Sequence, residues 1–281
     1  MCHATPMDDY QDVNRRWWDE AAAVHAASPD YATARFAEDP DYLSGVVRFD
    51  LPRLGDVRGL DGVHLQCHIG TDTVSLARLG ARMVGLDFSQ AAVEEARRLA
   101  TWAGVDATFV AGDVSEAPEV LGKSRFDLVY TGMGALNWLP DIRRWAQVVA
   151  DLLRPGGRLF LREGHPVLFA LDDERSDGLL VLEHSYFEHE EPLTTDEDGT
   201  YVETEHVFTN TVAHEWNHGL GEIVTAVLDA GMELSMLEEH DSIRWEALPG
   251  QMEDIGDGEL RLSDRPRRLP HTFTLQARYP A

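Results

Sequence analysis

Basic residues are scarce in this sequence, which has 24 lysines and arginines against 50 acidic residues in a chain of 281. The resulting formal charge of −26 repels phosphate groups, so neither nucleic acid nor an anionic membrane surface is an expected partner. No apolar stretch approaches the roughly 20 residues that cross a bilayer. The N-terminal residues also lack a basic segment followed by an apolar run, so we expect no signal peptide. These shortages together predict a soluble, cytoplasmic protein.

Cysteine is scarce as well, since the chain has only Cys2 and Cys67. The first is next to the N-terminus and the second lies in an apolar segment, so we expect no disulfide. Hydrophobic residues nevertheless make up 43% of the chain, which is enough for a core. The length suits one large domain, or one domain with a sizeable insertion.

Short apolar segments alternate with amphipathic ones from residue 63 to residue 162. This alternation predicts a parallel sheet with helices on both faces. Ser89 is an apt N-cap for one of the helices, and Gly104 is an apt C-cap for the same helix. The predicted strands are 63–67, 82–86, 107–111, 126–130 and 158–162, and the predicted helices are 71–79, 90–103 and 142–153.

Residues 176–213 interrupt this rhythm with two strand-like stretches, 179–187 and 201–209. We therefore expect an antiparallel insertion after the fifth strand. The remaining predicted elements are a helix that Gly231 ends, strands at 232–240 and 271–279, and a long loop over 248–270.

Glycine is scarce where a nucleotide-binding fold would need it. The loop after the first strand reads LQCHIGTDT and contains only Gly70, so it lacks both the G-x-G-x-x-G pattern and the lysine of a P-loop. A nicotinamide oxidoreductase is therefore disfavoured. Asp87 ends the second strand, where a carboxylate typically accepts both ribose hydroxyls, and Asp113 ends the third, where it could accept from an adenine amine. Each aspartate alone could be a helix cap or a turn former, but polar groups at three successive strand ends favour a ligand site.

Three stretches of the chain resemble a known family. They read VHLQCHIGTDTVSLARLGARMVGLDFSQAAVEEAR, FVAGDV and RFDLVYTGMGALNWLPDIRRWAQVVADLLRPGGRLFLREGHP. These motifs are similar to those of the class I S-adenosylmethionine-dependent methyltransferases, specifically a bacterial subgroup whose first motif is L-Q-C-H-x-G. The broader family has Asp, Gly and Gly where this chain has His64, Gln66 and His68. The resemblance extends from about residue 14 to residue 230, and more loosely to the end.

The resemblance implies an α/β fold, with a Rossmann-like seven-stranded methyltransferase sheet that is mostly parallel and has an antiparallel last strand. It implies a helical lid over 1–55 and a methyltransferase domain over 56–281, with a β arm inserted at about 176–213. The implied activity is in-line transfer of a methyl group from S-adenosylmethionine to a small-molecule acceptor, which leaves S-adenosylhomocysteine. The inserted arm could pair between subunits, which would give a homodimer.

The resemblance also implies a set of cofactor-binding residues. Those beside the methionine moiety are Gln66, Cys67, His68 and Gly70, with Thr131 and Gly132 at its amino-acid end. The ribose residues are Asp87, Phe88 and Ser89, and the adenine residues are Asp113 and Val114. In the lid, aromatic rings could keep a cationic methyl donor dry and oriented, and Trp18 and Tyr31 are the favoured candidates.

Residues 214–218 read HEWNH, which matches the H-E-x-x-H zinc-protease signature. That signature needs both histidines on one continuous helix. Gly219 and Gly221 follow, so we predict instead that the helix begins near 217–219 with Asn217 as its N-cap, and that His214 lies before it. A zinc hydrolase is therefore the weaker alternative, and no metal is predicted. Five histidines between 184 and 218 are interpreted as solvated side chains rather than as a metal site.

The segments after strands four and five would cover the methyl group in this architecture. Their residues are therefore the candidates for lining the acceptor pocket. The candidate substrate residues are Asn137, Trp138, Glu163 and Trp216, and the candidate bases are His165, His214 and His218. A base is needed only if the acceptor loses a proton as it attacks. A further alternative is a protein that binds S-adenosylmethionine without methylating anything.

Overall fold

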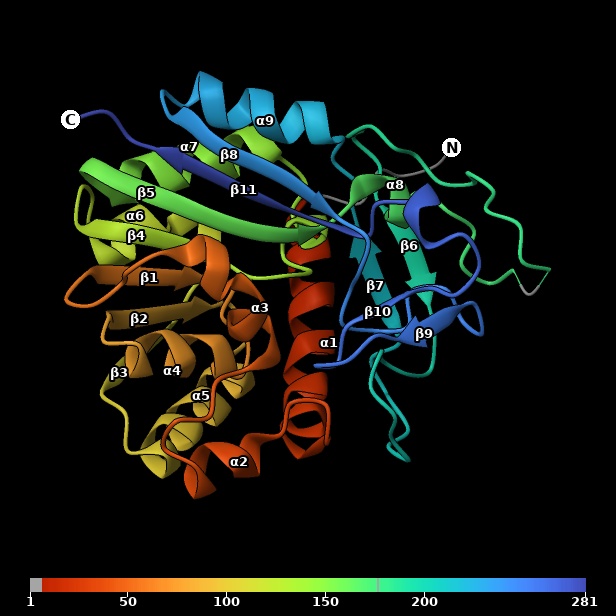
Figure 1. Cartoon of the computed structure of the whole chain (residues 1–281), viewed down its shortest axis with the longest axis horizontal. Helices are drawn as coiled ribbons and strands as arrows, with labels where there is room; N and C mark the ends of the chain where they lie inside the picture. Colours follow the sequence, from red (N-terminus) through yellow and green to blue (C-terminus); the bar gives the residue numbers. More distant parts are fainter. Residues whose placement is uncertain (1–6, 176) are drawn as a thin grey trace.

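The computed structural model describes residues 7–175 and 177–281, so Cys2 and the first residue of the predicted arm lie outside the described residues. Seven strands form one sheet in the order β3-β2-β1-β4-β5-β11-β8 (Figure 1). Strands β1 to β5 are parallel, and β11 runs antiparallel to both β5 and β8. The bounds are β1 Asp61–Leu65, β2 Arg82–Asp87, β3 Ala107–Ala111, β4 Phe126–Thr131, β5 Leu153–Gly164, β8 Glu233–His240 and β11 Thr272–Arg278. The predicted methyltransferase-type sheet is confirmed.

Helices cover both faces of the sheet, and the alternation of side chains along the strands explains why. In β4, Leu128 and Tyr130 pack toward α3 and α4, whereas Val129 packs on the other face against α7 and α9. Helix α5 packs beside α4, and α6 packs beside α7. The bounds are α3 Gly45–Leu54, α4 Thr71–Arg78, α5 Gln90–Ala103, α6 Ala117–Leu121, α7 Ile142–Leu152, α8 Pro166–Phe169 and α9 Leu220–Asp229. Short 3-10 turns lie at η1 Val114–Glu116, η2 Leu136–Trp138 and η3 Pro266–Arg268.

The caps of α5 are those predicted from the sequence. The hydroxyl of Ser89 accepts a hydrogen bond from the Ala92 backbone N–H at 3.0 Å, and Gly104 ends the helix in the left-handed conformation with φ 64°. Ser89 is only two residues beyond Asp87, the last residue of β2, so α5 begins close to the end of that strand.

The N-terminal helix α1 (Met7–Ala27) crosses the carboxyl ends of the strands and separates the sheet from the inserted segment (Figure 1). Asp19 on α1 accepts hydrogen bonds from the Ser89 hydroxyl at 2.7 Å and from the Ala91 backbone N–H. Glu20 accepts from the backbone N–H groups of Thr209 and Asn210, at 2.8 and 2.9 Å. Adjacent carboxylates of one helix thus hold the sheet on one side and the insertion on the other. A short helix, α2 (Thr33–Glu38), follows and packs on α5.

The insertion is antiparallel as predicted, but its strands lie elsewhere in the sequence. They are β6 (Leu193–Asp196) and β7 (Val212–Glu215), and neither predicted stretch forms one of them. Leu179, Leu182 and Phe187 of the first predicted strand are exposed. β7 forms where α1 supplies partners, because Asn14 donates to the carbonyl of His214 and accepts from its N–H, both at 2.8 Å.

The predicted loop over 248–270 is also more ordered than expected. It contains two short antiparallel strands, β9 (Met252–Asp254) and β10 (Leu260–Leu262). Leu248, Leu262 and Leu269 are buried in a small core with Leu168 of α8, so tertiary packing orders a segment that has no clear sequence periodicity. In the described part of the chain, no helix has the length and apolarity to span a bilayer.

Candidate functional site

Two cavities lie at the carboxyl ends of β1, β2 and β4, and both are lined by Gln66, Asp87, Phe88 and Trp138. The small cavity, of about 40 Å³, is bounded further by Asp113 and Val114 after β3, by Trp216, and by residues of α1. The large cavity, of about 540 Å³, extends over the first turn and beneath the insertion. Their shared wall suits an elongated ligand with one end in each cavity.

The turn after β1 contains few glycines, but two of its other residues have backbone angles that are typical of glycine. Gln66 and His68 both have positive φ, 55° and 47°, and both line the large cavity. A non-glycine residue in this left-handed region costs about 1–2 kcal/mol, so side chains are held here at an energetic cost. Gln66 donates from Nε2 to the Ala135 carbonyl at 2.8 Å, while its Oε1 is buried without a partner among the described residues. His68 Nδ1 is likewise buried and unpartnered within that same set. Both atoms are suited to a polar ligand.

Gly132, after β4, lies close to two polar side chains of the large cavity. A Cβ there would lie 3.3 Å from Asp72 Oδ2 and 3.4 Å from His64 Nε2, and all three residues line the large cavity. His64 is fixed by a 2.9 Å hydrogen bond between its Nδ1 and the Thr73 hydroxyl. Asp72 therefore places a carboxylate beside the position where the broader family has an aspartate and this chain has His64.

Asp87 is the carboxylate at the meeting point of the two cavities. Its Oδ2 accepts from the His68 N–H at 2.8 Å, and its Oδ1 accepts from the Ser89 N–H at 2.9 Å. Burial raises its pKa to about 6 even though these two bonds lower it, and the nearby carboxylate of Asp19 raises it further. The side chain is thus held rigidly, with the acceptor capacity that ribose hydroxyls require.

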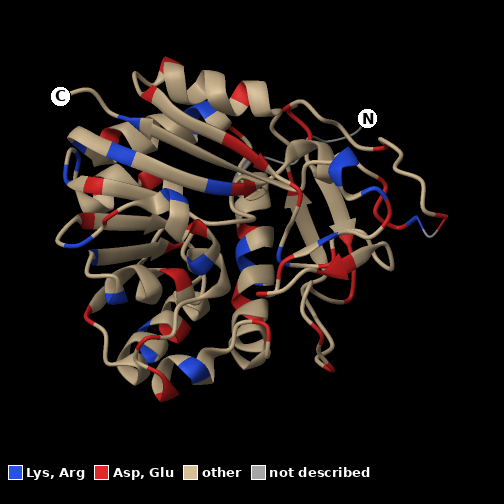
Figure 2. Cartoon of the chain, viewed as in Figure 1, with Lys and Arg blue, Asp and Glu red and all other residues tan. Residues whose placement is uncertain are grey.

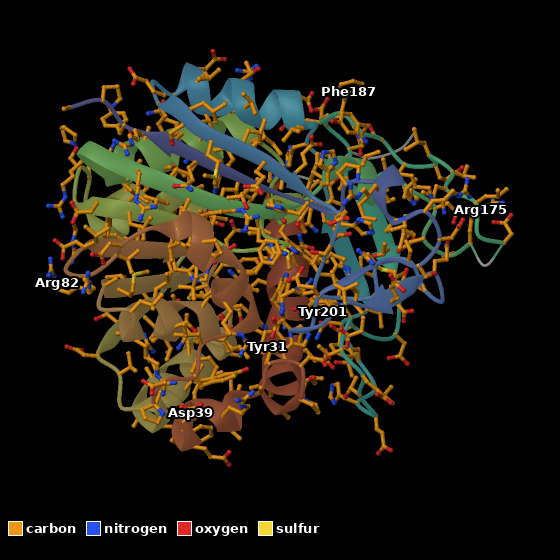
Figure 3. The ribbon with its side chains drawn as sticks, in the orientation of Figure 1. Tyr31, Asp39, Arg82, Arg175, Phe187 and Tyr201 are labelled. Atoms are coloured by element: carbon orange, nitrogen blue, oxygen red, sulfur yellow. The ribbon has the colours of Figure 1, made fainter. Side chains whose placement is uncertain are left out.

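Histidine and tyrosine side chains connect the lid, the first turn and the insertion. His25 Nδ1 lies 2.8 Å from His68 Nε2, and His25 Nε2 lies 2.7 Å from the Thr200 hydroxyl. The hydroxyls of Tyr31 and Tyr201 form a short hydrogen bond, and Figure 3 shows these two residues next to each other. Burial lowers the pKa of His25 to about 4, so its imidazole is neutral at pH 7.

The two tryptophans of the lid have different places. Trp17 is buried between Phe208 and Trp138, with its ring stacked 5.7 Å from that of Trp138. Trp18 lines the large cavity, with its ring 4.9 Å from the His68 ring. Trp18 and Tyr31 therefore both line the large cavity, whereas Trp17 anchors α1 on the insertion.

The loop after β4 is shaped by Glu163, which the sequence analysis assigned to substrate. Its carboxylate accepts backbone N–H bonds from Gly134, Ala135 and Leu136 at 2.5 to 2.9 Å. It is not among the described residues that line either cavity. The structure thus places Glu163 behind the loop, where it positions Asn137 rather than touching a ligand.

The three candidate base histidines are likewise absent from the described lining of both cavities, and each ring has a protein partner. His165 caps α8 and bonds to Glu239 at 2.9 Å. His214 bonds to the Thr194 hydroxyl at 2.9 Å, and His218 bonds to Glu188 at 2.7 Å. Burial lowers the pKa values of His165 and His214. Through these contacts, the three histidines support the segments around the site.

The HEWNH segment does not form a zinc-type helix. His214 lies in β7 and His218 in the following loop, and α9 begins only at Leu220, with Gly219 rather than Asn217 as its N-cap. Across residues 7–175 and 177–281, no group of three or more histidine, cysteine or acidic side chains is arranged to hold a metal ion.

Three other predicted cofactor residues support the site from behind. Gly70 is the N-cap of α4 with φ 79°, and a Cβ there would come within 2.8 Å of Ala96 and Phe109. Ser89 caps α5, and Thr131 is fully buried at the end of β4. Cys67 lines the large cavity as a buried free thiol.

Several cavity residues were missed by the sequence analysis. They include Asp72, Tyr201, Glu215 and Arg244. Of these four residues, only Glu215 lies in a recognisable sequence motif. That motif is HEWNH, which the sequence relates to zinc proteases. Glu215 Oε1 accepts from Asn137 Nδ2 at 2.6 Å.

Figure 2 shows acidic residues distributed over both the sheet and the insertion, which agrees with the strongly negative net charge.

Residues 63–159 match a protein family described as "Methyltransferase domain". This part of the chain is therefore similar to methyltransferase domains. The matched segment runs from β1 into β5 and includes the turn at Gln66–His68, Asp87 and Asp113. Together with the fold, this match supports the cofactor predicted from the sequence, S-adenosylmethionine.

A ubiquinone biosynthesis O-methyltransferase of Xanthomonas oryzae pv. oryzae (strain PXO99A) is 30% identical to this chain over 178 residues. The aligned region covers 60% of this chain and 65% of that protein, so the chain spans just under two thirds of that relative. An S-adenosylmethionine-dependent methyltransferase from Mesorhizobium loti has a similar fold, with a TM-score of 0.60, 21% identity and coverage of 84% and 98% of the two chains. The [4+2]-cyclase SpnF also shares the fold, with a TM-score of 0.52, 16% identity and coverage of 84% and 80%.

Proposed function

We propose that this protein transfers the methyl group of S-adenosylmethionine to a small-molecule acceptor. The observation that carries the proposal is the pair of cavities that share Asp87, a small one bounded by Asp113 and a large one lined with aromatic rings. Their walls come from the successive strand ends where an open α/β sheet binds ligands. The 30% identity to an O-methyltransferase supports the same reaction class.

The residues present fit the cofactor. Asp87 would accept from the ribose hydroxyls, and Asp113 and Val114 would contact the adenine in the small cavity. Gln66, His68 and Gly132 would surround the methionine moiety, and Asp72 offers a carboxylate to its ammonium group. Trp18 and Tyr31 would cover the methyl donor and exclude water. When bound, the cofactor supplies a methyl group on a positively charged sulfur, which is an activated leaving group.

The chain's own contribution is orientation. The loop that carries Asn137 and Trp138 is fixed by Glu163, and α1 is fixed by Asp19 and Glu20, so the walls around the reacting atoms are held before a ligand arrives. Holding two well-oriented reactants in line can lower the activation barrier by about 7–11 kcal/mol. Methyl transfer therefore needs little further help unless the acceptor must lose a proton.

Calorimetry with S-adenosylmethionine and S-adenosylhomocysteine tests this proposal. We expect one site per chain, and we expect Asp87→Ala to weaken both ligands by at least tenfold because two ribose hydrogen bonds are lost, each worth about 1.5–3 kcal/mol to a charged group. Asp106→Ala, in the turn between α5 and β3, is the matched control and should bind normally. Equal affinity of Asp87→Ala and the wild type would contradict the ribose assignment.

A protein that binds S-adenosylmethionine without methylating is the second candidate. The cyclase neighbour favours keeping it, because it shows that this fold also supports a protein named for a different reaction. The two candidates differ in product. A methyltransferase supplied with a suitable acceptor forms S-adenosylhomocysteine, whereas a binding protein forms none with any acceptor.

A further inference from the structure

We propose that Glu215 is the general base of this methyl transfer and that the acceptor is a phenol, a hydroxyl group on an aromatic ring that enters the large cavity. This inference rests on the proposed function and adds to it the proton acceptor and the acceptor class. In the sequence, Glu215 is the glutamate of HEWNH, which neither zinc chemistry nor the cofactor explains.

Strand alternation directs Glu215 into the large cavity. Residues 213 and 215 of β7 share one face, and residues 214 and 216 share the other. Ala213 packs against α1 with Trp17, and Glu215 lines the cavity, whereas the ring of His214 packs 4.7 Å from that of Tyr10. The base therefore comes from the insertion and reaches the site over the end of the sheet.

Asn137 holds the carboxylate in position. Its Nδ2 donates to Glu215 Oε1 at 2.6 Å, and its backbone carbonyl accepts from the Trp216 N–H at 2.7 Å. Asn137 itself belongs to the loop that Glu163 fixes, next to Trp138 on the shared wall of the two cavities. One oxygen of Glu215 is thus anchored, and Oε2 remains to take a proton from a ligand.

The surroundings also give Glu215 the basicity that the step requires. Burial raises its pKa to about 7 despite the hydrogen bond from Asn137, and the carboxylates of Asp173 and Glu197 raise it further. A general base works best when its pKa lies near the working pH. An ordinary exposed glutamate, with a pKa of about 4.3, would be a weak base for removing a proton from a phenol.

The walls of the large cavity favour an aromatic acceptor. Its volume of about 540 Å³ exceeds what a methionine moiety fills, and rings line several sides, which suits a flat ring that packs edge to face or offset. These rings include Trp18, Tyr31, Trp138, Phe169, Tyr201 and Trp245. Nearby acidic groups disfavour an acceptor that enters as an anion, so the phenol enters neutral and loses its proton within the site.

The proposed step balances. The phenol oxygen forms a bond to the methyl carbon as the bond between that carbon and sulfur breaks, and the sulfur keeps the electron pair. The hydroxyl proton passes to Glu215 Oε2. The products are a methyl ether, neutral S-adenosylhomocysteine and a protonated Glu215, which returns its proton to water when the products leave.

The first test measures Glu215 itself. Protein labelled with ¹³C at the glutamate carboxyl carbon is titrated by NMR with S-adenosylhomocysteine present, and the Glu215 signal is the one that E215Q lacks. We expect a midpoint between pH 6 and 8, because burial raises the pKa of Glu215 to about 7. Normal cofactor binding with a midpoint below pH 5 would overturn the base assignment alone. No cofactor binding by the wild type would overturn the proposed function as well.

The second test separates a base from a merely structural carboxylate. Wild type, E215Q and E205Q are supplied with S-adenosylmethionine and with two probes at pH 9: a simple alkyl-substituted phenol, and a nitrophenol that is already ionised. Glu205 is exposed on the same insertion and provides the matched substitution. We expect E215Q to lose about 10²- to 10⁴-fold in rate with the neutral phenol relative to the wild type. The ionised probe enters the acidic site less readily in every variant but needs no base, so its rate should differ little between E215Q and the wild type. E205Q should match the wild type with both probes.

Equal losses of E215Q with both probes would mean that Glu215 only shapes the loop, and would overturn the base assignment. Methylation of neither probe by a wild-type protein that binds the cofactor would overturn the phenol class.

Discussion

At the scale of a single residue, the proposed ribose contact of Asp87 predicts that cofactor binding depends on pH. Its pKa of about 6 is raised above the ordinary value of 3.8, mainly by burial. Ribose hydroxyls donate to the ionised form, so a bound cofactor lowers this pKa and binding releases a proton near pH 6. We therefore expect the affinity for S-adenosylhomocysteine to be constant above pH 7 and to fall as the pH drops through 6, by up to about tenfold per unit.

Calorimetry from pH 5 to 8 checks this dependence. Asp87→Asn removes the titrating group while keeping the shape of the side chain, so its weaker affinity should no longer change across pH 6. A wild-type affinity that is flat between pH 5 and 8 would show that Asp87 is already ionised in the free protein.

Individual residues also show where the sequence was informative. Asp87, Phe88, Asp113 and Val114 follow strands with clear periodicity, and the structure places all four on the cavities. The side-chain roles were less predictable. Gly70, Ser89 and Glu163 lie near strand ends and contact other protein groups, and Thr131 is fully buried with no hydrogen-bond partner for its hydroxyl among the described residues. No local pattern in the sequence distinguishes a residue that lines a cavity from one that supports it.

Helix α1 is the element on which the lid depends. Glu20 binds the insertion through Thr209 and Asn210, and its carboxylate is also 3.1 Å from His206 Nε2. Although burial raises the pKa of Glu20, the hydrogen bonds from Thr209, Asn210 and His206 lower it to about 2. We expect Glu20→Ala to destabilise the protein by about 1–3 kcal/mol, because several donors lose their acceptor.

Chemical denaturation at pH 7 measures this loss, and limited proteolysis should show faster cleavage near Thr209. Asp12→Ala on the same helix removes only an exposed ion pair to Arg15 and should change stability by less than about 1 kcal/mol. Because the folded pKa of Glu20 is depressed, its contribution is present above its ordinary pKa of 4.5 and is lost as the pH falls toward 2. If the Glu20→Ala protein were as stable and as protease-resistant as the wild type at pH 7, Glu20 would not be what holds the insertion to α1.

At the scale of the whole molecule, the sheet was predictable and the large cavity was not. The strand and helix periods between residues 63 and 162 determine the parallel half of the sheet, and the observed bounds differ from the predicted ones mainly in the longer β5. The cavity instead joins Trp18, Tyr201, Glu215 and Arg244, which are far apart in the chain. Such a site depends on where α1 places the insertion, and that placement relies on single hydrogen-bonding groups such as Asn14 and Glu20.

A crystal structure of the protein with S-adenosylhomocysteine is the most direct measurement of the central claim. The account predicts the ribose hydroxyls on Asp87, the adenine beside Asp113 and Val114, and the amino-acid end in the large cavity next to Gly132. It also predicts the sulfur on the side of the cavity that Asn137 and Glu215 face. A ligand bound away from Asp87, or one that leaves both cavities empty, would contradict the account.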